Sequence, residues 1–528
     1  MKIIISIIFF LGFGLQTVLA DTDTEEDEEK PEQIEATPKV SDYVQNLRDG
    51  VEEGRKEADN KNCKLVLEKL VSGVEQKEKF ATIGKTGKSS VLYHLVECAV
   101  VTNDFELALV HTEDLVNVIK DSSFQLTRWF QLGRFLDKPK QAQKALSRIV
   151  SIDPSLLLKI KQRDLWQHWR QLKSMSDPQG QRFLMAGWLV NNNYIPPNKS
   201  YRPGAFHLHY AKGLMRKGQV KQAEKILSAY PSDDISHDVQ SLKVFEPLWK
   251  KRGFSKKYDI LTGLQSKIDW QLRASQDIPD HLRVIIGLME SYQYLGKLEQ
   301  AKQLGVAALQ KIDAAKLQDE TAFTDLEEDH SWLLNQLAII AGIQDETEQT
   351  ISYYRQAINL DGQETPNVSQ LINLSSYLTM LGQPEQALLE ISKIIPENAS
   401  NYGKAFVHYI RACSYAQTGD NIQMDFEISK LAAYKNDNPN VIGLALLCAN
   451  RTDEAAAHYI GLLSSPEHKD QTLRAFFNYQ PPINSSEWQL ILQERLEKLA
   501  KRPDVQIAIA KVGRIIDVPF TSYSWGVI

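Results

Sequence analysis

Residues 83 to 92 read IGKTGKSSVL, and their glycines and lysines are of the types that bind phosphate. In a nucleotide-binding loop, glycine backbone amides and one lysine hold the phosphates at the start of a helix that follows a buried strand. That loop needs a further glycine at the position of Thr82, and the preceding residues EQKEKFAT are too polar for a buried strand. We therefore interpret the stretch as a break between two helical segments, with Ser89 or Ser90 capping the second one.

The chain has four cysteines, and they form two pairs with the same spacing. Cys63 and Cys98 are 35 residues apart, and so are Cys413 and Cys448. An even number of cysteines in local pairs is typical of disulfides in an oxidising compartment. Because the Cα atoms of a disulfide lie closer together than the axes of packed helices usually do, the paired cysteines must face each other. Four buried free thiols are the alternative, since cysteine is often a small core residue.

No other set of side chains forms a recognised catalytic or metal-binding pattern. His94 and Cys98 lie one helical turn apart and could bind zinc together with Cys63, but three ligands without a Cys-x-x-Cys pair make a poor zinc site. The motifs of zinc proteases, serine hydrolases and dinucleotide-binding enzymes are absent from the chain. We therefore expect a protein without a metal ion, a cofactor or catalytic residues, and not an enzyme.

The first 20 residues predict export from the cytoplasm. Lys2 precedes an apolar stretch that is too short to span a membrane, and small residues up to Ala20 precede an acidic segment, as in a cleaved signal peptide. We expect a location in a bacterial periplasm, with secretion or the ER lumen as the alternative. We expect no transmembrane segment in the mature chain.

Residues 21 to 40 are expected to form a disordered acidic linker. Residues 21–39 contain nine acidic residues, two lysines and no aromatic residue, so they cannot bury enough apolar surface to fold. The whole chain carries a net charge of −6, and this segment alone carries −7, which leaves the rest close to neutral. A neutral body argues against nucleic acid as a partner, because such binding relies on a basic surface.

Residues 41 to 480 show a recurring helical pattern. In the three clearest copies, an apolar helix ends at Gly218, Gly296 or Gly382, and an alanine follows five residues later. Glycine at a helix end accepts the left-handed conformation that reverses the chain, and alanine allows two helices to pack closely. The pattern resembles the tetratricopeptide repeat (TPR), a helix–turn–helix unit of about 34 residues.

This resemblance implies an all-α solenoid of stacked helix–turn–helix repeats, a TPR-like right-handed superhelix with a concave groove. Aligning the glycine and alanine positions places repeat starts at residues 89, 123, 204, 282, 331, 368, 405 and 436. The fifth position of each first helix is then expected to line the groove at Tyr93, Thr127, Leu208, Ile286, Asn335, Ile372 and Tyr409. Such mostly apolar and uncharged side chains suit an extended peptide or a partner helix.

Residues 481 to 528 depart from the repeat pattern. Residues 486–502 have the spacing of an amphipathic helix, and the last residues, RIIDVPFTSYSWGVI, are apolar and aromatic without helical spacing. We expect a helical cap and an apolar tail that cover the end of the array, or a binding element if the tail is exposed.

These features together predict a non-catalytic interaction scaffold of the cell envelope. Its partners would be other envelope or secreted proteins, bound in the concave groove, and we expect no small-molecule ligand. The alternative is an envelope enzyme or a glycan-binding module that uses carboxylates and the groove aromatics Tyr93, Trp129 and Tyr409.

Overall fold

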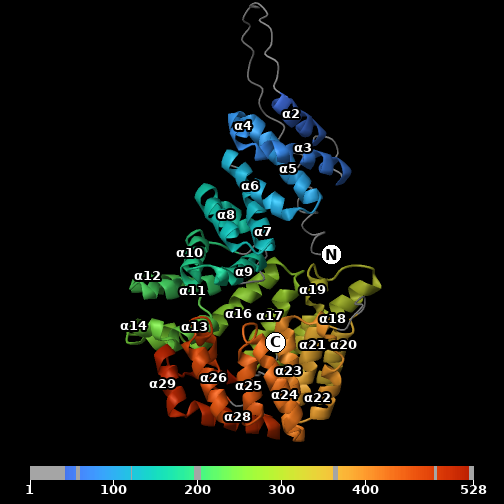
Figure 1. Ribbon diagram of the computed structural model, residues 1–528. Coiled ribbons are helices and arrows are strands. Elements are labelled where there is room, and N and C mark those ends of the chain that lie inside the picture. The colour runs from blue at the N-terminus through green and yellow to red at the C-terminus, as the bar shows by residue number, and fades with distance from the viewer. Residues whose placement is uncertain are drawn as a thin grey trace, which may run out of the picture. The chain divides into compact units, whose positions relative to one another are not determined.

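The computed structural model describes residues 42–54, 60–119, 122–195, 204–360, 367–480 and 484–521. The predicted signal peptide, the acidic linker and the last seven residues of the apolar tail lie outside this part of the chain. The chain divides into two compact units, Met1–Pro197 and Asn198–Ile528, which we call unit 1 and unit 2 (Figure 1).

Unit 1 is a series of short helices, most of which pack against the next one along the chain. These helices are α2 (Asp42–Gly54), α3 (Asn60–Glu75), α4 (Lys77–Thr82), α5 (Lys85–Val101), α6 (Phe105–Val118), α7 (Ser123–Phe135), α8 (Pro139–Ile152), α9 (Gln162–Gln171) and α10 (Pro178–Asn191). Two 3-10 helices, η1 (Pro154–Lys159) and η2 (Leu172–Ser174), flank α9. Leu70, Leu92 and Leu95 are fully or almost fully buried in a core shared by α2, α3, α5 and α6.

Unit 2 begins with a less regular stretch and continues as a regular stack of helix pairs. Its first elements are α11 (Gly204–Arg216), α12 (Val220–Ala229), α13 (Asp233–Ser241), η3 (Lys243–Phe245), α14 (Glu246–Trp249), α15 (Phe254–Lys257), α16 (Ile260–Asp277), α17 (Leu282–Tyr294), α18 (Leu298–Leu317), α19 (Leu326–Ile343) and α20 (Thr347–Ile358). The later ones are α21 (Val368–Met380), α22 (Pro384–Ile391), η4 (Pro396–Asn398), α23 (Asn401–Thr418), α24 (Asn421–Leu431), η5 (Ala432–Tyr434), α25 (Asn440–Cys448), α26 (Thr452–Ser464), α27 (Lys469–Arg474), β1 (Asn478–Gln480), α28 (Glu487–Ala500), α29 (Pro503–Val512) and β2 (Asp517–Thr521).

The structure confirms the all-α, TPR-like repeat fold that the sequence predicted. In every expected repeat, the fifteenth position adopts the left-handed backbone conformation between the two helices, with φ between 53° and 78°. Glycine accepts this conformation freely, and asparagine and aspartate tolerate it because their short polar side chains bond locally. The residues at this position are Asn103, Asp137, Gly218, Gly296, Asp345, Gly382, Gly419 and Asn450.

The twentieth position of each repeat is buried, as the alanine pattern predicted. Six of the eight repeats have a completely buried alanine there, so the second helix can pack closely against its neighbours. The other two repeats have Thr350 and Met424, which are also buried. The six alanines are Ala108, Ala142, Ala223, Ala301, Ala387 and Ala455.

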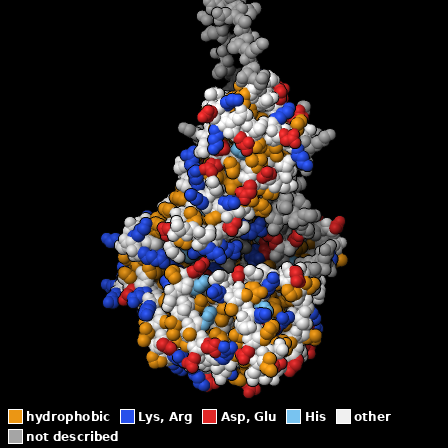
Figure 2. All heavy atoms as spheres, viewed as in Figure 1, with side chains coloured by type: hydrophobic (Ala, Val, Ile, Leu, Met, Phe, Trp, Pro, Cys, Tyr) orange, Lys and Arg blue, Asp and Glu red, His pale blue; other side chains and the backbone are white. Residues whose placement is uncertain are grey.

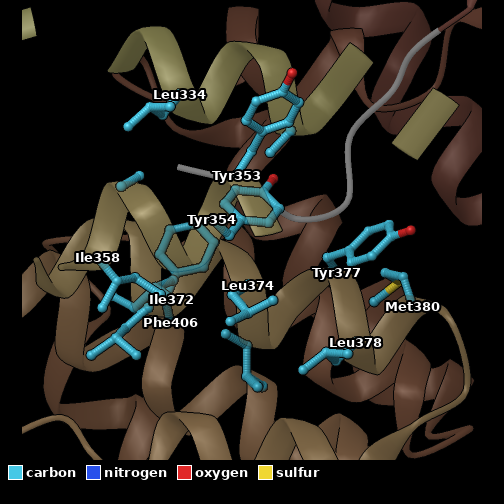
Figure 3. Packing of buried hydrophobic residues seen from close by; sticks show 14 of the residues in the cluster. Leu334, Tyr353, Tyr354, Ile358, Ile372, Leu374, Tyr377, Leu378, Met380 and Phe406 are labelled. Atoms are coloured by element: carbon cyan, nitrogen blue, oxygen red, sulfur yellow. The ribbon is translucent and has the colours of Figure 1, made fainter. Parts of the chain in front are cut away.

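One apolar core runs through the repeats of unit 2 from α17 to α25. Figure 3 shows its middle, where Tyr354 of α20 and Tyr377 of α21 lie with their ring centroids 6.3 Å apart. Ile372 of α21 and Phe406 of α23 belong to the same core. Because neighbouring repeats share these side chains, no repeat buries its apolar face alone.

The C-terminal segment packs on the last repeats and then returns to the first helices of unit 2. Helix α28 contacts α25 and α26 and crosses below them in Figure 1. Trp488 and Leu492 of α28 extend the apolar core. Further on, Gly513 forms an antiparallel backbone bridge with Leu242. A Cβ atom at Gly513 would overlap the Ser241 carbonyl oxygen, so only glycine fits there.

The end of the described chain forms a small strand pair that the sequence pattern did not predict. Strand β2 runs parallel to β1, with Asn478 opposite Asp517. Val518 is completely buried and Phe520 is 7% exposed, while their neighbours in β2 are exposed or half-buried. This part of the tail therefore belongs to the core of unit 2.

The glycine-rich stretch 83 to 92 lies at a helix–helix junction, as expected, but its serines have a different role. Helix α4 precedes it, and α5 already begins at Lys85 with Gly84 as its N-cap residue. Ser89 lies inside α5, and its hydroxyl donates to the Thr86 carbonyl oxygen at 2.9 Å. The expectation that Ser89 or Ser90 caps the helix is therefore wrong, because the helix begins one turn earlier. Among all described helices, none is both long and apolar enough to cross a membrane.

Candidate functional site

The two cysteine pairs connect neighbouring helices, as their spacing predicted. Cys63 of α3 and Cys98 of α5 have Cα atoms 4.7 Å apart and are joined by a disulfide. Cys413 of α23 and Cys448 of α25 are joined in the same way, with a Cα separation of 5.1 Å. All four side chains are buried and none is a free thiol. Cys63 and Cys98 are therefore oxidised and do not serve as thiolate ligands, which leaves His94 as the only one of the three candidate zinc ligands.

Five of the seven expected groove residues are buried inside unit 2. None of them exposes more than 7% of its surface, and Ile286, Asn335, Ile372 and Tyr409 pack in or beside the apolar core. They line no open surface within the described structure. The five are Leu208, Ile286, Asn335, Ile372 and Tyr409.

Buried polar side chains connect the helices of unit 2 where those groove residues lie. The Asn373 side-chain amide of α21 donates a hydrogen bond to Asn335 of α19 at 2.7 Å. Gln336 of α19 donates to Gln293 of α17 at 2.6 Å, and a threonine–serine pair joins α21 to α23. Buried polar groups need such partners, so these hydrogen bonds connect the first helices of neighbouring repeats.

The other two expected groove residues stay near the surface of unit 1. Tyr93 of α5 and Thr127 of α7 are half-buried. Here the two helices are joined by longer side chains, because the Arg128 guanidinium donates to the Glu97 carboxylate at 2.5 Å. Arg128 is only 2% exposed and lies 4.5 Å from the centroid of the Phe124 ring, which is itself 36% exposed. We call Tyr93, Glu97, Phe124, Thr127 and Arg128 the α5–α7 face.

The electrostatics of the α5–α7 face keep its tyrosine neutral and its ion pair fixed. Burial raises the pKa of the Tyr93 hydroxyl, the Glu97 charge raises it further, and Arg128 lowers it. The tyrosine is therefore a hydrogen-bonding group and not an anion at neutral pH. Figure 2 shows charged and apolar side chains interspersed over the visible side of α5 to α8. Such a surface offers apolar anchors together with fixed charges.

A second polar layer lies below this face, between α7 and α9. Arg134 of α7 lies 3.3 Å from the Asp164 carboxylate of α9 and donates a short hydrogen bond to Gln167. His168 of α9 is completely buried and hydrogen-bonds to Gln143 at 2.8 Å. Burial and the nearby Arg134 charge lower the pKa of His168 to about 4. His168 is therefore neutral at physiological pH and supports the helix packing.

Unit 2 contains an ionic cluster around the buried Lys212 and Asp238, which no sequence pattern indicated. The ammonium group of Lys212 on α11 lies 2.6 Å from Asp238 of α13 and 2.9 Å from Asp470 of α27. The Arg474 guanidinium of α27 contacts the same Asp238 at 2.7 Å and Asp234 at 3.0 Å. We call these five residues the ionic seam. Helix α27 is more than 200 residues from α11 and α13 in the sequence, so no local motif connects its two residues to the other three.

The charges of the ionic seam satisfy one another. Burial alone would raise the pKa of Asp238, but the Lys212 and Arg474 charges and their hydrogen bonds hold it below its usual range. Burial would lower the pKa of Lys212, but Asp238 and Asp470 raise it above its usual value. All these groups are therefore charged and paired at neutral pH. The seam attaches α27, and with it the C-terminal segment, to the first helices of unit 2.

Other ionisable groups continue beside the seam along α16 and α17. The Lys267 ammonium lies 3.8 Å from Asp233, and burial raises the pKa of the half-buried Glu290. Burial is the largest cause that raises the pKa of Tyr294 to about 12, and the charge of Glu290 is the second. The Tyr294 ring packs against Phe520 of β2, with 5.0 Å between centroids. The run DDISHD at residues 233 to 238 is the sequence feature that marks this region, since four of its five polar residues are buried and such residues are rarely buried without partners.

A surface hollow of 550 Å³ lies beside α24, away from the expected groove positions. Its most prominent charge, Arg451, is paired with Glu454 and with Asp425. Within the described residues, no three His, Cys, Asp or Glu side chains are grouped closely enough to hold a metal ion. The residues that line the hollow are Asn421, Met424, Asp425, Ile428, Ser429 and Arg451.

Comparison with known proteins gives only distant structural likenesses. No protein-family profile matches the chain, and no curated protein matches it in sequence. Solved structures similar to it include yeast Tom70, which is 13% identical with a TM-score of 0.30 over 89% of this chain and 99% of that one. The APC/C hetero-tetramer Cut9–Hcn1 is 11% identical with a TM-score of 0.28, over 87% and 96% of the two chains. The TPR domain of P58(IPK) is 12% identical with a TM-score of 0.17, over 78% and 99%.

Proposed function

We propose that this protein is a non-catalytic scaffold of the bacterial cell envelope that binds partner proteins through the α5–α7 face of unit 1. The observation that carries the proposal is the contrast between the two units. The same repeat position is buried at Ile372 and Tyr409 in unit 2 but stays half-buried at Tyr93 and Thr127 in unit 1. The α5–α7 face is thus where expected groove residues remain accessible.

The chemistry of the face supports a protein partner. Tyr93 and Phe124 are aromatic side chains of the kind that anchor interfaces, because they bury much area at little cost in side-chain entropy. Glu97 is held in place by the buried Arg128, so its carboxylate is a fixed acceptor. A partner would match this arrangement if one extended segment or one helix of it presented an apolar side chain next to a hydrogen-bond donor.

The state of the ionisable groups supports a non-catalytic role. In the ionic seam, Asp238 is buried and shared between Lys212 and Arg474, so it has no free charge to act on a substrate. The most perturbed histidine, His168, is completely buried against Gln143. Both groups stabilise the helix packing.

Export is supported by the predicted signal peptide and by the two disulfides, which persist in oxidising compartments. A fusion of residues 1–40 to a reporter enzyme that is active only outside the cytoplasm tests the location. Reporter activity supports the envelope location. A reporter that stays inactive although it is produced contradicts it.

Site-specific photo-crosslinking in the producing cell tests the binding face. A photoreactive residue at Thr127 is expected to link one defined partner protein. The matched control is Val110 on α6, which is 55% exposed and is not part of the α5–α7 face. The purified partner should then lose about ten-fold or more in affinity for the Tyr93→Ala variant, as for an interface hot spot. Equal cross-links from Thr127 and Val110, or none from either, would reject the proposed face.

A further inference from the structure

Charge is distributed unevenly along the N-terminal part of the chain. Residues 42–119 contain ten basic and fourteen acidic residues, a net charge of −4. Residues 122–195 contain twelve basic and four acidic residues, a net charge of +8. The segment 21–39, with nine acidic residues and two lysines, carries −7. The net charge of −6 for the whole chain therefore hides two strongly charged regions of opposite sign.

The exposed positive charge of unit 1 is concentrated on α9 and its flanking turns. Arg163 and Arg170 are seven residues apart, which places them on the same side of the helix. Trp166 lies between them, is half-buried, and packs edge-on against Trp169 with 5.6 Å between centroids. We call this surface the basic stripe. Its cations are the exposed Lys159, Lys161, Arg163, Arg170 and Lys173.

Acidic side chains of unit 1 neutralise other cations but not the whole stripe. Glu97 is paired with Arg128, and Glu113 is paired with Lys144. Arg134 forms an ion pair with Asp164, the one acidic residue of α9. Within the described residues, Arg170 and Lys173 form no ion pair. Arg170 and Lys173 thus leave positive charge at the C-terminal end of the stripe that no acidic side chain of the described residues balances.

We propose that the acidic segment 21–39 docks in cis on the basic stripe of α9. The segment is joined to α2, which belongs to the same unit as α9. Nineteen extended residues reach about 60 Å, whereas three helix-to-helix steps from α3 to α9 cover only about 30 Å. Tethering gives an effective concentration of about 1 mM or more, so many weak charge contacts are enough for docking.

The docked segment shields the stripe from other polyanions, and high salt releases it. Residues 42–119 do not attract the acidic segment, because their net charge is also negative. The proposal concerns α9 and stands independently of partner binding at the α5–α7 face.

Zero-length carbodiimide cross-linking tests the docking on the chain from Asp21 to Ile528. This reagent joins carboxylates to lysine amines only when they are in contact. At low ionic strength we expect links within one molecule between the acidic segment and Lys159, Lys161 or Lys173. These links should disappear at roughly 0.5 M salt, where the Debye length is only a few Å.

Charge reversal separates the stripe from the rest of the surface. The Arg170→Glu, Lys173→Glu variant should lose most of the remaining links to Lys159 and Lys161, and both sites are exposed, so the fold is retained. Lys77→Glu, Lys85→Glu is the matched control on exposed lysines of α4 and α5, and it should leave the links unchanged. Docking in cis would be overturned if both variants lost the links equally or if the wild-type chain formed no links. It would also be overturned if links formed only between isotopically distinct copies.

Discussion

Asn373 of α21 and Asn335 of α19 are hydrogen-bonded at 2.7 Å, although 38 residues separate them and both are buried. The pair lies in the first helices of two successive repeats, where an open groove was expected. Its short side chains connect the two helices, and the neighbouring Ile372, an expected groove residue, is buried. In unit 1 the same kind of connection is the longer Glu97–Arg128 pair, and there the surface stays accessible.

Replacing Asn373 with leucine should destabilise the protein by about 1–3 kcal/mol, because it leaves the buried Asn335 amide without its partner. Replacing both residues with leucine should cost less than the sum of the two single changes. Urea denaturation of the four proteins of this double-mutant cycle measures the coupling. Strict additivity would mean that the observed hydrogen bond contributes nothing.

Removing the Cys413–Cys448 disulfide with a double alanine variant should lower stability by about 3–4 kcal/mol. The disulfide closes a loop of 35 residues, and its loss increases the entropy of the unfolded chain. Thermal unfolding with and without a reducing agent checks this value. Mass spectrometry of unreduced peptides should pair Cys413 with Cys448 and Cys63 with Cys98, and any other pairing contradicts the structure.

Asp238→Asn should break the ionic seam and destabilise unit 2 by about 3–5 kcal/mol, because Lys212 and Arg474 then lose a buried counter-charge. The pKa of Asp238 is depressed in the folded state, so its contribution is present above the pKa of the unfolded aspartate and is lost as the pH falls through the folded pKa. Denaturant unfolding at neutral and acidic pH measures both effects. Glu494→Gln, in an exposed pair with Lys498, is the matched control and should leave stability nearly unchanged, because exposed ion pairs contribute little.

His168 should make stability depend on pH in the mildly acidic range. Its pKa is about 4 in the folded protein and about 6.5 when unfolded, so the unfolded chain takes up the proton first. The contribution, on the order of 3 kcal/mol, is complete above about pH 6.5 and is lost as the pH falls to about 4. His168→Gln should remove this component of the pH profile of unfolding, whereas His281→Gln, at a partly exposed site, should leave it.

Gly513→Ala should release the C-terminal segment from the first helices of unit 2, since the added methyl group meets the Ser241 carbonyl. Faster proteolysis between residues 513 and 521 is the expected result. Gly461→Ala is the matched control, because a Cβ atom there meets no other atom within 4 Å. This exposed helical site should become slightly more stable, by about 0.5–1 kcal/mol. Equal proteolysis of both variants would show that close packing at Gly513 does not hold the segment.

Local patterns predicted most of the repeat architecture. The expected starts at 123, 204, 282 and 368 are the first residues of α7, α11, α17 and α21. The other four, at 89, 331, 405 and 436, differ by four or five residues from the first residues of α5, α19, α23 and α25. Turn and alanine positions could be predicted because each depends on one backbone conformation or one close contact that recurs along the chain. The strand pair of the C-terminal segment could not be predicted in this way, because β1 and β2 exist only through pairing between distant residues.

The sequence by itself determined the helical repeats, the left-handed turns and the pairing of the cysteines, since all of these follow from spacing within one or two repeats. Only the tertiary structure decided which repeat positions are accessible. Whether a first-helix residue such as Tyr93 or Tyr409 is accessible depends on the side chains that connect its helix to the next one. The tertiary structure also creates the ionic seam, because the return of the C-terminal segment brings Asp470 and Arg474 to Lys212 and Asp238. Burial and charge pairing across such distances are properties of the assembled core, which no local spacing records.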